Sequence, residues 1–139
     1  RREREHMCKR FKRLGDADAE IMQILWRENA PLSAGQIHTA LQGQRSWALS
    51  TLMTVLARLA DKGFVECIRT EKPNRYAALV AKTDYQASES RSFLARLYGN
   101  SVQSMMATLY DSRMLDGQDV RELRAFLDEL EQRGRKEEE

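Results

Sequence analysis

Apolar positions recur at helical spacing through the first half of the chain. Ile21, Ile24 and Leu25 fall on one face of a helix whose first turn is acidic, where the helix dipole favours negative charge. Further along, Ser33 stands three residues ahead of Gln36, which is the capping-box pattern of a helix start. We therefore predict two consecutive helices, over residues 16–29 and 34–41.

A third helical pattern occupies residues 46–63. Its leucines and its valine share one side of a helical wheel, whereas small and hydroxyl-bearing residues share the other. The apolar side comprises Leu52, Val55, Leu56 and Leu59. Gly63 is the predicted stop, because glycine readily adopts the left-handed conformation that ends many helices. One side of this helix is thus sufficient for the core, and the other is available for different contacts.

After Gly63 the pattern changes from helical to strand-like. The segments FVECIRT and RYAALVA are rich in β-branched and aromatic residues, and EKPN between them supplies turn formers. They predict a β-hairpin with basic side chains around its tip. These side chains are Arg69, Lys72 and Arg75. Three short helices followed by a basic hairpin is the element order of a winged helix-turn-helix domain.

From residue 83 onward the pattern returns to helix, interrupted at Gly99-Asn100. Two apolar stripes follow the helical repeat, and the second has spacings of 3, 4 and 3 residues, as in a coiled-coil seam. The stripes comprise Phe93, Leu94 and Leu97, then Val120, Leu123, Leu127 and Leu130. Because a chain of this length can hardly cover the seam alone, we expect a homodimer interface here. The closing RGRKEEE is predicted to be a solvated tail without regular structure.

The composition, with 42% hydrophobic and 32% charged residues, is that of a soluble globular protein. No apolar run approaches the roughly 18–20 residues that span a bilayer, and the basic N-terminus lacks the apolar segment of a signal peptide. We expect a cytoplasmic protein without membrane contact. The net charge of +2 is uneven: residues 1–80 carry 14 Lys+Arg against 9 Asp+Glu, and residues 81–139 carry 9 against 12. The first part is therefore the candidate polyanion-binding part.

Motifs of enzymes and metal sites are missing from the sequence. It contains no P-loop, no nucleophile elbow and no HExxH pattern. Cys8 and Cys67 lie far apart and the two histidines, His6 and His38, are not clustered, so neither a zinc site nor a disulfide framework is indicated. We predict no catalytic residue, no metal and no cofactor. Cys67 is expected to be an inert, partly buried cysteine, with a redox switch as the alternative.

The hydroxyl-bearing side of the third helix either binds a ligand or is ordinary solvent-exposed surface. Ser50, Thr51 and Thr54 would keep the helix slim enough for a major groove about 12 Å wide, and hydroxyls can donate or accept at base edges or phosphates. Arg58 could reach a phosphate, and Trp47 either wedges the helix against the body or touches the DNA backbone. Exposed serine and threonine are most often ordinary surface. The preceding capped helix, the basic hairpin and the charge excess favour DNA here; a protein-binding adaptor of the same fold is the alternative.

From about residue 14 to 132 the chain resembles the penicillinase-repressor (BlaI/MecI/CopY) family of bacterial winged-helix regulators. The resemblance is carried by LGDADAEIMQILW, LSTLMTVLARLADKGFV, NRYAALV, FLARLYGNSVQSMM and LDGQDVRELRAFLDEL. It implies a repressor that dimerises through its C-terminal helices and reads an inverted-repeat operator. By position, the resemblance puts Ser50, Thr51 and Thr54 at the recognition-helix contacts and Arg58 at a constant arginine.

Two parts of the chain depart from the pattern of that family. In β-lactam-responsive members a membrane sensor leads to cleavage of an Asn-Phe bond, and the aligned residues here are Thr108-Leu109. The resemblance implies that a sensor-activated protease cuts the chain at this position. Copper-responsive members carry a cysteine-rich C-terminal hook, whereas this chain has no cysteine after Cys67. Thiol oxidation at Cys67 or a small ligand between the domains are the other candidate signals.

The sequence thus predicts a mainly α fold with a small β-hairpin wing, built from an N-terminal winged helix-turn-helix and a C-terminal helical dimerisation region. The predicted parts are a basic extension over 1–13, a DNA-binding domain over 14–82, a dimerisation domain over 83–133 and a charged tail over 134–139. The predicted function is homodimeric, sequence-specific repression at an inverted-repeat operator, of β-lactamase or related stress-response genes. An adaptor, or a redox- or ligand-responsive regulator unrelated to β-lactams, is the alternative.

Overall fold

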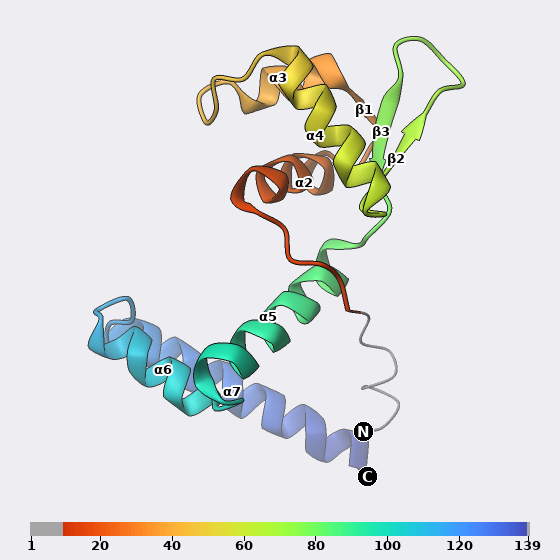
Figure 1. Ribbon diagram of the computed structural model, residues 1–139. Coiled ribbons are helices and arrows are strands. Elements are labelled where there is room, and N and C mark those ends of the chain that lie inside the picture. The colour runs from red at the N-terminus through yellow and green to blue at the C-terminus, as the bar shows by residue number, and fades with distance from the viewer. Residues whose placement is uncertain (1–9, 139) are drawn as a thin grey trace. The chain divides into compact units, whose positions relative to one another are not determined.

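The computed structural model describes residues 10–138 (Figure 1). The predicted fold class is confirmed: the chain is mainly helical, with a winged helix-turn-helix in its N-terminal part and helices in its C-terminal part. Two compact units are present, the first ending at Ser90 and the second beginning at Arg91. The division falls inside helix α5 (Lys82–Tyr98) instead of in front of it, so one helix begins in the first unit and ends in the second.

Three helices and a three-stranded antiparallel sheet build the first unit (Figure 1). The helices begin and end close to the predicted residues. They are α2 (Asp16–Glu28), α3 (Ala34–Leu41) and α4 (Leu49–Asp61). The strands are β1 (Leu32–Ser33), β2 (Val65–Ile68) and β3 (Arg75–Ala78), in the order β1-β3-β2. The hairpin of β2 and β3, with the turn between them, is the wing.

Strand β1 is a feature that the sequence patterns do not predict. Leu32 pairs with Tyr76 and Ser33 with Arg75, which adds a third strand beside the hairpin. Ser33 also begins α3, because its hydroxyl accepts a hydrogen bond from the Gln36 amide at 3.2 Å, and the Gln36 side chain accepts one from the Ser33 amide at 2.9 Å. The predicted capping box is confirmed, and the same residue ends a strand and caps a helix.

One apolar core joins these helices to the sheet. All four residues of the predicted apolar side of α4 are buried in it. The largest fully buried side chains are Phe64, Ile21, Met22, Ile37, Leu41, Leu52, Leu56, Leu59 and Val65. Because burying one side chain of this kind stabilises the folded state by roughly 1.5–3 kcal/mol, the core holds α4 firmly with its other side outward.

The segment in front of α2, residues 10–14, packs on the first turns of α5, and we call it the N-terminal strap. Backbone amides of the strap and one of its arginines reach side chains of α5. The contacts are the hydrogen bonds from the Phe11 amide to Ser88 Oγ (3.1 Å) and from the Leu14 amide to the Tyr85 hydroxyl (2.8 Å), and the ion pair Arg13–Glu89 (3.5 Å). The Tyr85 ring also lies among the rings of Phe11, Trp26 and Phe64. The start of α5 is thereby part of the first unit.

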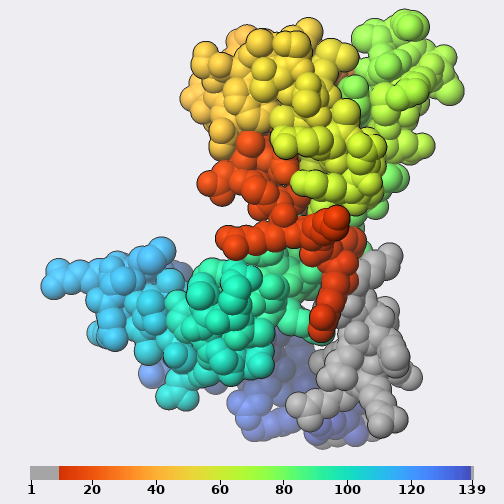
Figure 2. Space-filling model, viewed as in Figure 1, coloured from red at the N-terminus to blue at the C-terminus, as the bar shows by residue number. Residues whose placement is uncertain are grey.

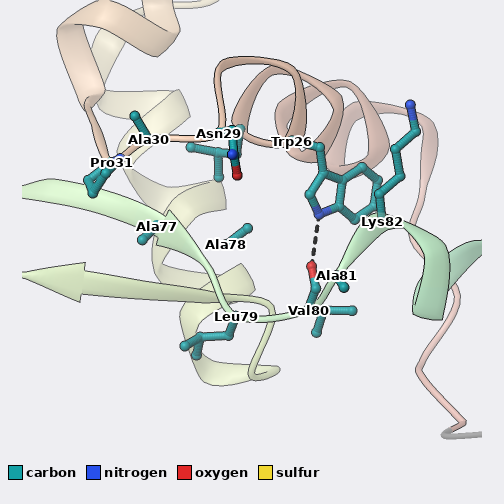
Figure 3. A pocket seen from close by; sticks show the side chains of 11 residues that line it. Trp26, Asn29, Ala30, Pro31, Ala77, Ala78, Leu79, Val80, Ala81 and Lys82 are labelled. Atoms are coloured by element: carbon teal, nitrogen blue, oxygen red, sulfur yellow. Dashed lines mark hydrogen bonds between the residues drawn. The ribbon is translucent and has the colours of Figure 1, made fainter.

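A second tie holds the chain between β3 and α5. The indole N–H of Trp26 on α2 donates to the carbonyl of Val80 at 2.8 Å (Figure 3). Around this bond lies a pocket of about 480 Å³, lined by the ends of α2 and β3 and by the segment up to Lys82. Lys82 is the one charged residue in its lining, which includes no carboxylate, histidine or cysteine. The pocket lining therefore offers no acid–base pair.

The second unit consists of the end of α5, α6 (Val102–Asp111) and α7 (Gly117–Glu138). The predicted interruption lies between α5 and α6, where Gly99 and Asn100 both have positive φ angles of 54° and 67°. None of the residues between Arg91 and Glu138 is buried. By itself this unit has no core, although its helices carry many apolar side chains.

Helix α7 extends further than the sequence predicts. The composition of RGRKEEE predicts no regular structure there, but the helix continues to Glu138. Two ion pairs at i, i+4 spacing explain the extension: Arg133 lies 3.9 Å from Glu129, and Arg135 lies 2.7 Å from Glu131. Each exposed pair of this kind stabilises a helix by about 0.3–0.5 kcal/mol.

Within residues 10–138 no helix has the length and apolar character required to cross a bilayer.

Candidate nucleic-acid interface

The residues of α4 that the sequence predicts as DNA contacts lie on the outward side of this helix. Ser50, Thr51, Thr54 and Arg58 are all exposed, while the opposite side of the helix is buried in the core. Atoms of α4 and of the wing lie next to each other on the visible face of the first unit (Figure 2). Small side chains and a cationic hairpin are therefore presented together by one compact unit.

Thr54 is restricted in what it can offer to a ligand. Its hydroxyl donates to the Ser50 carbonyl one turn earlier, at 3.1 Å. Since the hydroxyl proton is used within the helix, Thr54 can contribute a methyl group and an oxygen that still accepts a hydrogen bond. A base edge next to Thr54 would accordingly present a donor or an apolar group.

The loop that leads into α4 is held by three side chains. His38 on α3 lies with Nε2 2.6 Å from the carbonyl oxygen of Trp47, and because a carbonyl only accepts, Nε2 is the protonated nitrogen. The Arg45 guanidinium lies 5.4 Å from the centre of the Trp47 ring and forms an ion pair with Glu20 on α2. The Trp47 ring is half-buried against the core. This packing agrees with the predicted role of Trp47 as a wedge at the start of α4, and its contact with the DNA backbone stays a prediction.

The bond between His38 and the Trp47 carbonyl is not among the features that the sequence predicts. The bond links a side chain to a backbone carbonyl nine residues later, and such a pair forms no pattern of residue types. The cation–π contact of Arg45 with Trp47 was likewise not predicted, although the two residues are close in sequence.

The wing carries the three predicted cationic side chains, Arg69, Lys72 and Arg75, and all are exposed. None of the ion pairs formed within residues 10–138 includes them or Arg58. The pKa of Arg69 is raised, first by a hydrogen bond with the Cys67 side chain, so its guanidinium stays charged. These side chains are thus available to a polyanion.

Cys67 is half-buried on β2 and pairs across the sheet with Tyr76. Burial raises the pKa of the Tyr76 phenol, and the neighbouring Cys67 adds to this effect. Partial burial of Cys67 agrees with the sequence prediction, whereas Cys8 lies outside the described residues. In the part of the chain that the structure describes, no three histidine, cysteine or acidic side chains are arranged so that they could hold a metal ion.

The predicted dimer residues lie on the helices of the second unit. Phe93, Leu94, Val120 and Leu123 are half-buried, and Leu97, Leu127 and Leu130 are exposed. A groove of about 670 Å³ separates α6 from α7. Its lining includes Met106 and Tyr110. The unit presents an extended apolar surface to its surroundings.

The bond between Thr108 and Leu109, the predicted cleavage position, lies in the last turn of α6. The Thr108 hydroxyl donates to the Ser104 carbonyl at 3.2 Å, and the Leu109 carbonyl accepts from the Met114 amide at 2.9 Å. Proteases bind their substrates as extended chain, so this turn would have to unwind before the bond is cut.

Comparison with known proteins gives one family over most of the chain. The family model for penicillinase repressors matches residues 14–129. The penicillinase repressor of Bacillus licheniformis is 27% identical over 90% of this chain and 97% of its own length. The transcriptional regulator BlaI of Mycobacterium tuberculosis is 33% identical over 88% of each chain. The methicillin resistance regulatory protein MecI of Mammaliicoccus sciuri is 29% identical over 82% of this chain and 92% of its own length.

A solved structure is also similar to part of the chain. It is the solution structure of monomeric Bacillus licheniformis BlaI in complex with the blaP half-operator. The match has a TM-score of 0.47 and 22% identity, and it covers 55% of this chain and 92% of that one.

Proposed function

Because the chain belongs to the penicillinase repressor family, we propose that it is a sequence-specific DNA-binding transcriptional repressor that acts as a homodimer on an inverted-repeat operator. The observation that supports DNA binding most directly is the exposed side of α4 beside a wing whose cations form no ion pairs within residues 10–138. The relative from Bacillus licheniformis, which is named a penicillinase repressor, supports the same role.

In the proposed complex, α4 enters the major groove and the wing follows the adjacent phosphate backbone. Ser50, Thr51 and Thr54 would approach base edges, because they are exposed on the first turns of α4. Arg58 and the wing cations would contact phosphates, which fixes the register of the helix without reading sequence. The loop held by His38 and Arg45 would keep the start of α4 at a constant depth.

A homodimer is proposed from the second unit. Apolar side chains along α7 remain exposed, with 53% of the Leu127 side chain and 41% of Leu130 accessible. No residue from Arg91 to Glu138 is buried, so this unit lacks a core of its own. A second copy of the same surface would cover these side chains and would bring two first units to the two halves of an inverted repeat.

Footprinting on the DNA upstream of its own coding sequence, followed by affinity measurements across a salt series, tests the proposal. Protection of a short inverted repeat is expected, with affinity falling by about 0.9 log units per log unit of salt for each phosphate neutralised. An adaptor that binds proteins would show no affinity for duplex DNA even at low salt, and that result would refute the proposal. Binding that does not change with salt would contradict the phosphate contacts.

We further propose that induction proceeds by cleavage near Thr108-Leu109, through a sensor-activated protease responding to β-lactams. Cutting there would separate α7 from the rest of the chain and so remove much of the proposed dimer surface. The footprint should disappear in extracts of β-lactam-treated cells together with the appearance of a shortened protein. Release of DNA by an intact chain would refute cleavage and favour oxidation of Cys67 or a bound ligand.

A further inference from the structure

On the premise of the proposed function, we infer that α4 recognises thymine methyl groups of the operator through Leu49 and Met53. Both are large apolar side chains on the recognition helix, and both are about half exposed, 44% for Leu49 and 47% for Met53. They are four residues apart, so they lie next to each other on one flank of the outward side of α4. Together with the methyl group of Thr54 they give this flank an apolar surface.

The polar side chains of α4 leave little other means of reading bases. Guanine and adenine are read mainly by arginine, lysine, asparagine and glutamine, which form paired hydrogen bonds with base edges. Residues 49–61 contain no lysine, asparagine or glutamine, and their single arginine, Arg58, lies near the end of the helix. The Thr54 hydroxyl proton is already donated to Ser50. Besides hydroxyl contacts of Ser50 and Thr51, apolar contact with the C5 methyl of thymine is therefore the main base-specific interaction that this helix can make.

The anchoring of the loop before α4 supports the same inference. Leu49 follows Trp47 by two residues, and Trp47 is held by His38 through its carbonyl and by Arg45 through its ring. A methyl contact is short-ranged and lost with a small displacement, so it discriminates bases only if the side chain is held at a constant depth. The contacts of Trp47 supply that constraint for the first turn of α4.

Replacing operator thymines one at a time by deoxyuridine tests the inference. This change removes only the C5 methyl and keeps the Watson–Crick pair and the phosphates. At the positions facing α4, affinity of the unmodified protein should fall about fourfold for each methyl, the effect of one buried methyl-sized group. The same replacement at thymines that lie within the footprint but do not face α4 should leave affinity unchanged, which controls for effects on the flexibility of the bound duplex.

Protein variants identify the side chain. Met53→Ala should weaken binding to the thymine operator and remove the loss caused by deoxyuridine at its own position, because the partner of that methyl is gone. Leu79→Ala is the matched control: Leu79 is a similarly exposed apolar side chain of the same unit but lies outside α4, and this variant should retain the full loss. If Met53→Ala fails to fold, deoxyuridine with the unmodified protein remains decisive.

Three outcomes of these experiments bear on three different claims. If the unmodified protein binds neither the operator with thymine nor the operator with deoxyuridine, the proposed repressor function is refuted. Tight binding with equal affinity for thymine and deoxyuridine at every position would overturn this inference and leave the repressor function intact. A deoxyuridine effect that persists in Met53→Ala and in Leu49→Ala would overturn the assignment to these two side chains.

Discussion

Thr54 and Arg75 lie on different elements of the first unit, and their loss should weaken DNA binding in different ways. Thr54→Ala should lower the preference for operator over random DNA by roughly 0.5–1.5 kcal/mol, the net contribution of one hydrogen bond, if the threonine faces a base. Arg75→Ala should weaken both affinities about equally and lower the salt slope by about 1, because it removes one phosphate contact. Fluorescence anisotropy with both DNAs across a salt series measures these quantities. Equal changes of the specificity ratio would contradict the assigned roles of helix and wing.

Tyr85 should contribute a pH-dependent part of the stability. Burial raises the pKa of its phenol above the ordinary value near 10. The folded state therefore favours the neutral phenol, so this contribution is complete below pH 10 and is lost as the pH rises through the raised pKa. Tyr85→Phe should weaken the loss of stability above pH 10, although Tyr76, whose pKa is also raised, will keep part of it.

At neutral pH the same substitution acts through hydrogen bonding. Tyr85→Phe leaves the buried amide of Leu14 without its acceptor, which should lower the free energy of unfolding by about 1–3 kcal/mol. Urea denaturation at pH 7 and above pH 10 measures both effects. Tyr110→Phe, at an exposed tyrosine of the second unit, is the control and should change neither value. An unchanged stability of Tyr85→Phe at pH 7 would show that the N-terminal strap contributes little.

Individual residues differ in how well the sequence predicts them. The apolar side of α4 and the pair Ser33–Gln36 follow local spacing rules, so both were predictable. The bond between His38 and the Trp47 carbonyl depends on how α3 and its following loop fold back, which no local rule contains. Tyr85 and the N-terminal strap are 71 residues apart at the Leu14 bond, and their contact follows from tertiary packing alone.

At the scale of elements, the cap of α3 should have a measurable effect on stability. Ser33→Ala removes the acceptor for the Gln36 amide, and the loss of such a cap costs about 1 kcal/mol. Thermal unfolding followed by circular dichroism should show a lower Tm. Ser90→Ala, at an exposed serine of α5, is the matched control and should stay within about 0.5 kcal/mol of the unmodified protein. A Tm equal to that of the control would indicate that β1 and not the cap fixes the start of α3.

Strand β1 and the end of α7 show why elements can escape prediction. A strand of two residues has no period to detect, and Leu32 and Ser33 form one only because β3 lies beside them. The end of α7 is highly charged, and such composition usually indicates an unstructured tail. Here the charges alternate in sign at i, i+4 spacing along the helix, so Arg135 pairs with Glu131 and does not repel its neighbours. Spacing therefore outweighs composition in this segment.

At the scale of the whole molecule, the proposed dimer depends on the apolar stripe of α7. Leu127→Glu would place a charge in the middle of that stripe, where a partner surface would have to desolvate it, and should dissociate the dimer. Sedimentation velocity at micromolar concentration measures the change. Gln132→Glu adds the same charge on the other side of the helix and should leave the dimer intact. A monomeric unmodified protein at this concentration would contradict the proposal.

The N-terminal strap has a consequence for exchanging DNA-binding heads between regulators. A chimera spliced in front of α5 would separate Tyr85, Ser88 and Glu89 from the strap that they bind. A workable junction must instead lie within α5, after Ser90, and the transplanted head must bring its own residues from position 10 onward. The DNA-binding part that can be exchanged is thus defined by the contact between the N-terminal strap and the start of α5. A splice at the loop in front of α5 would leave both of these segments without their partners.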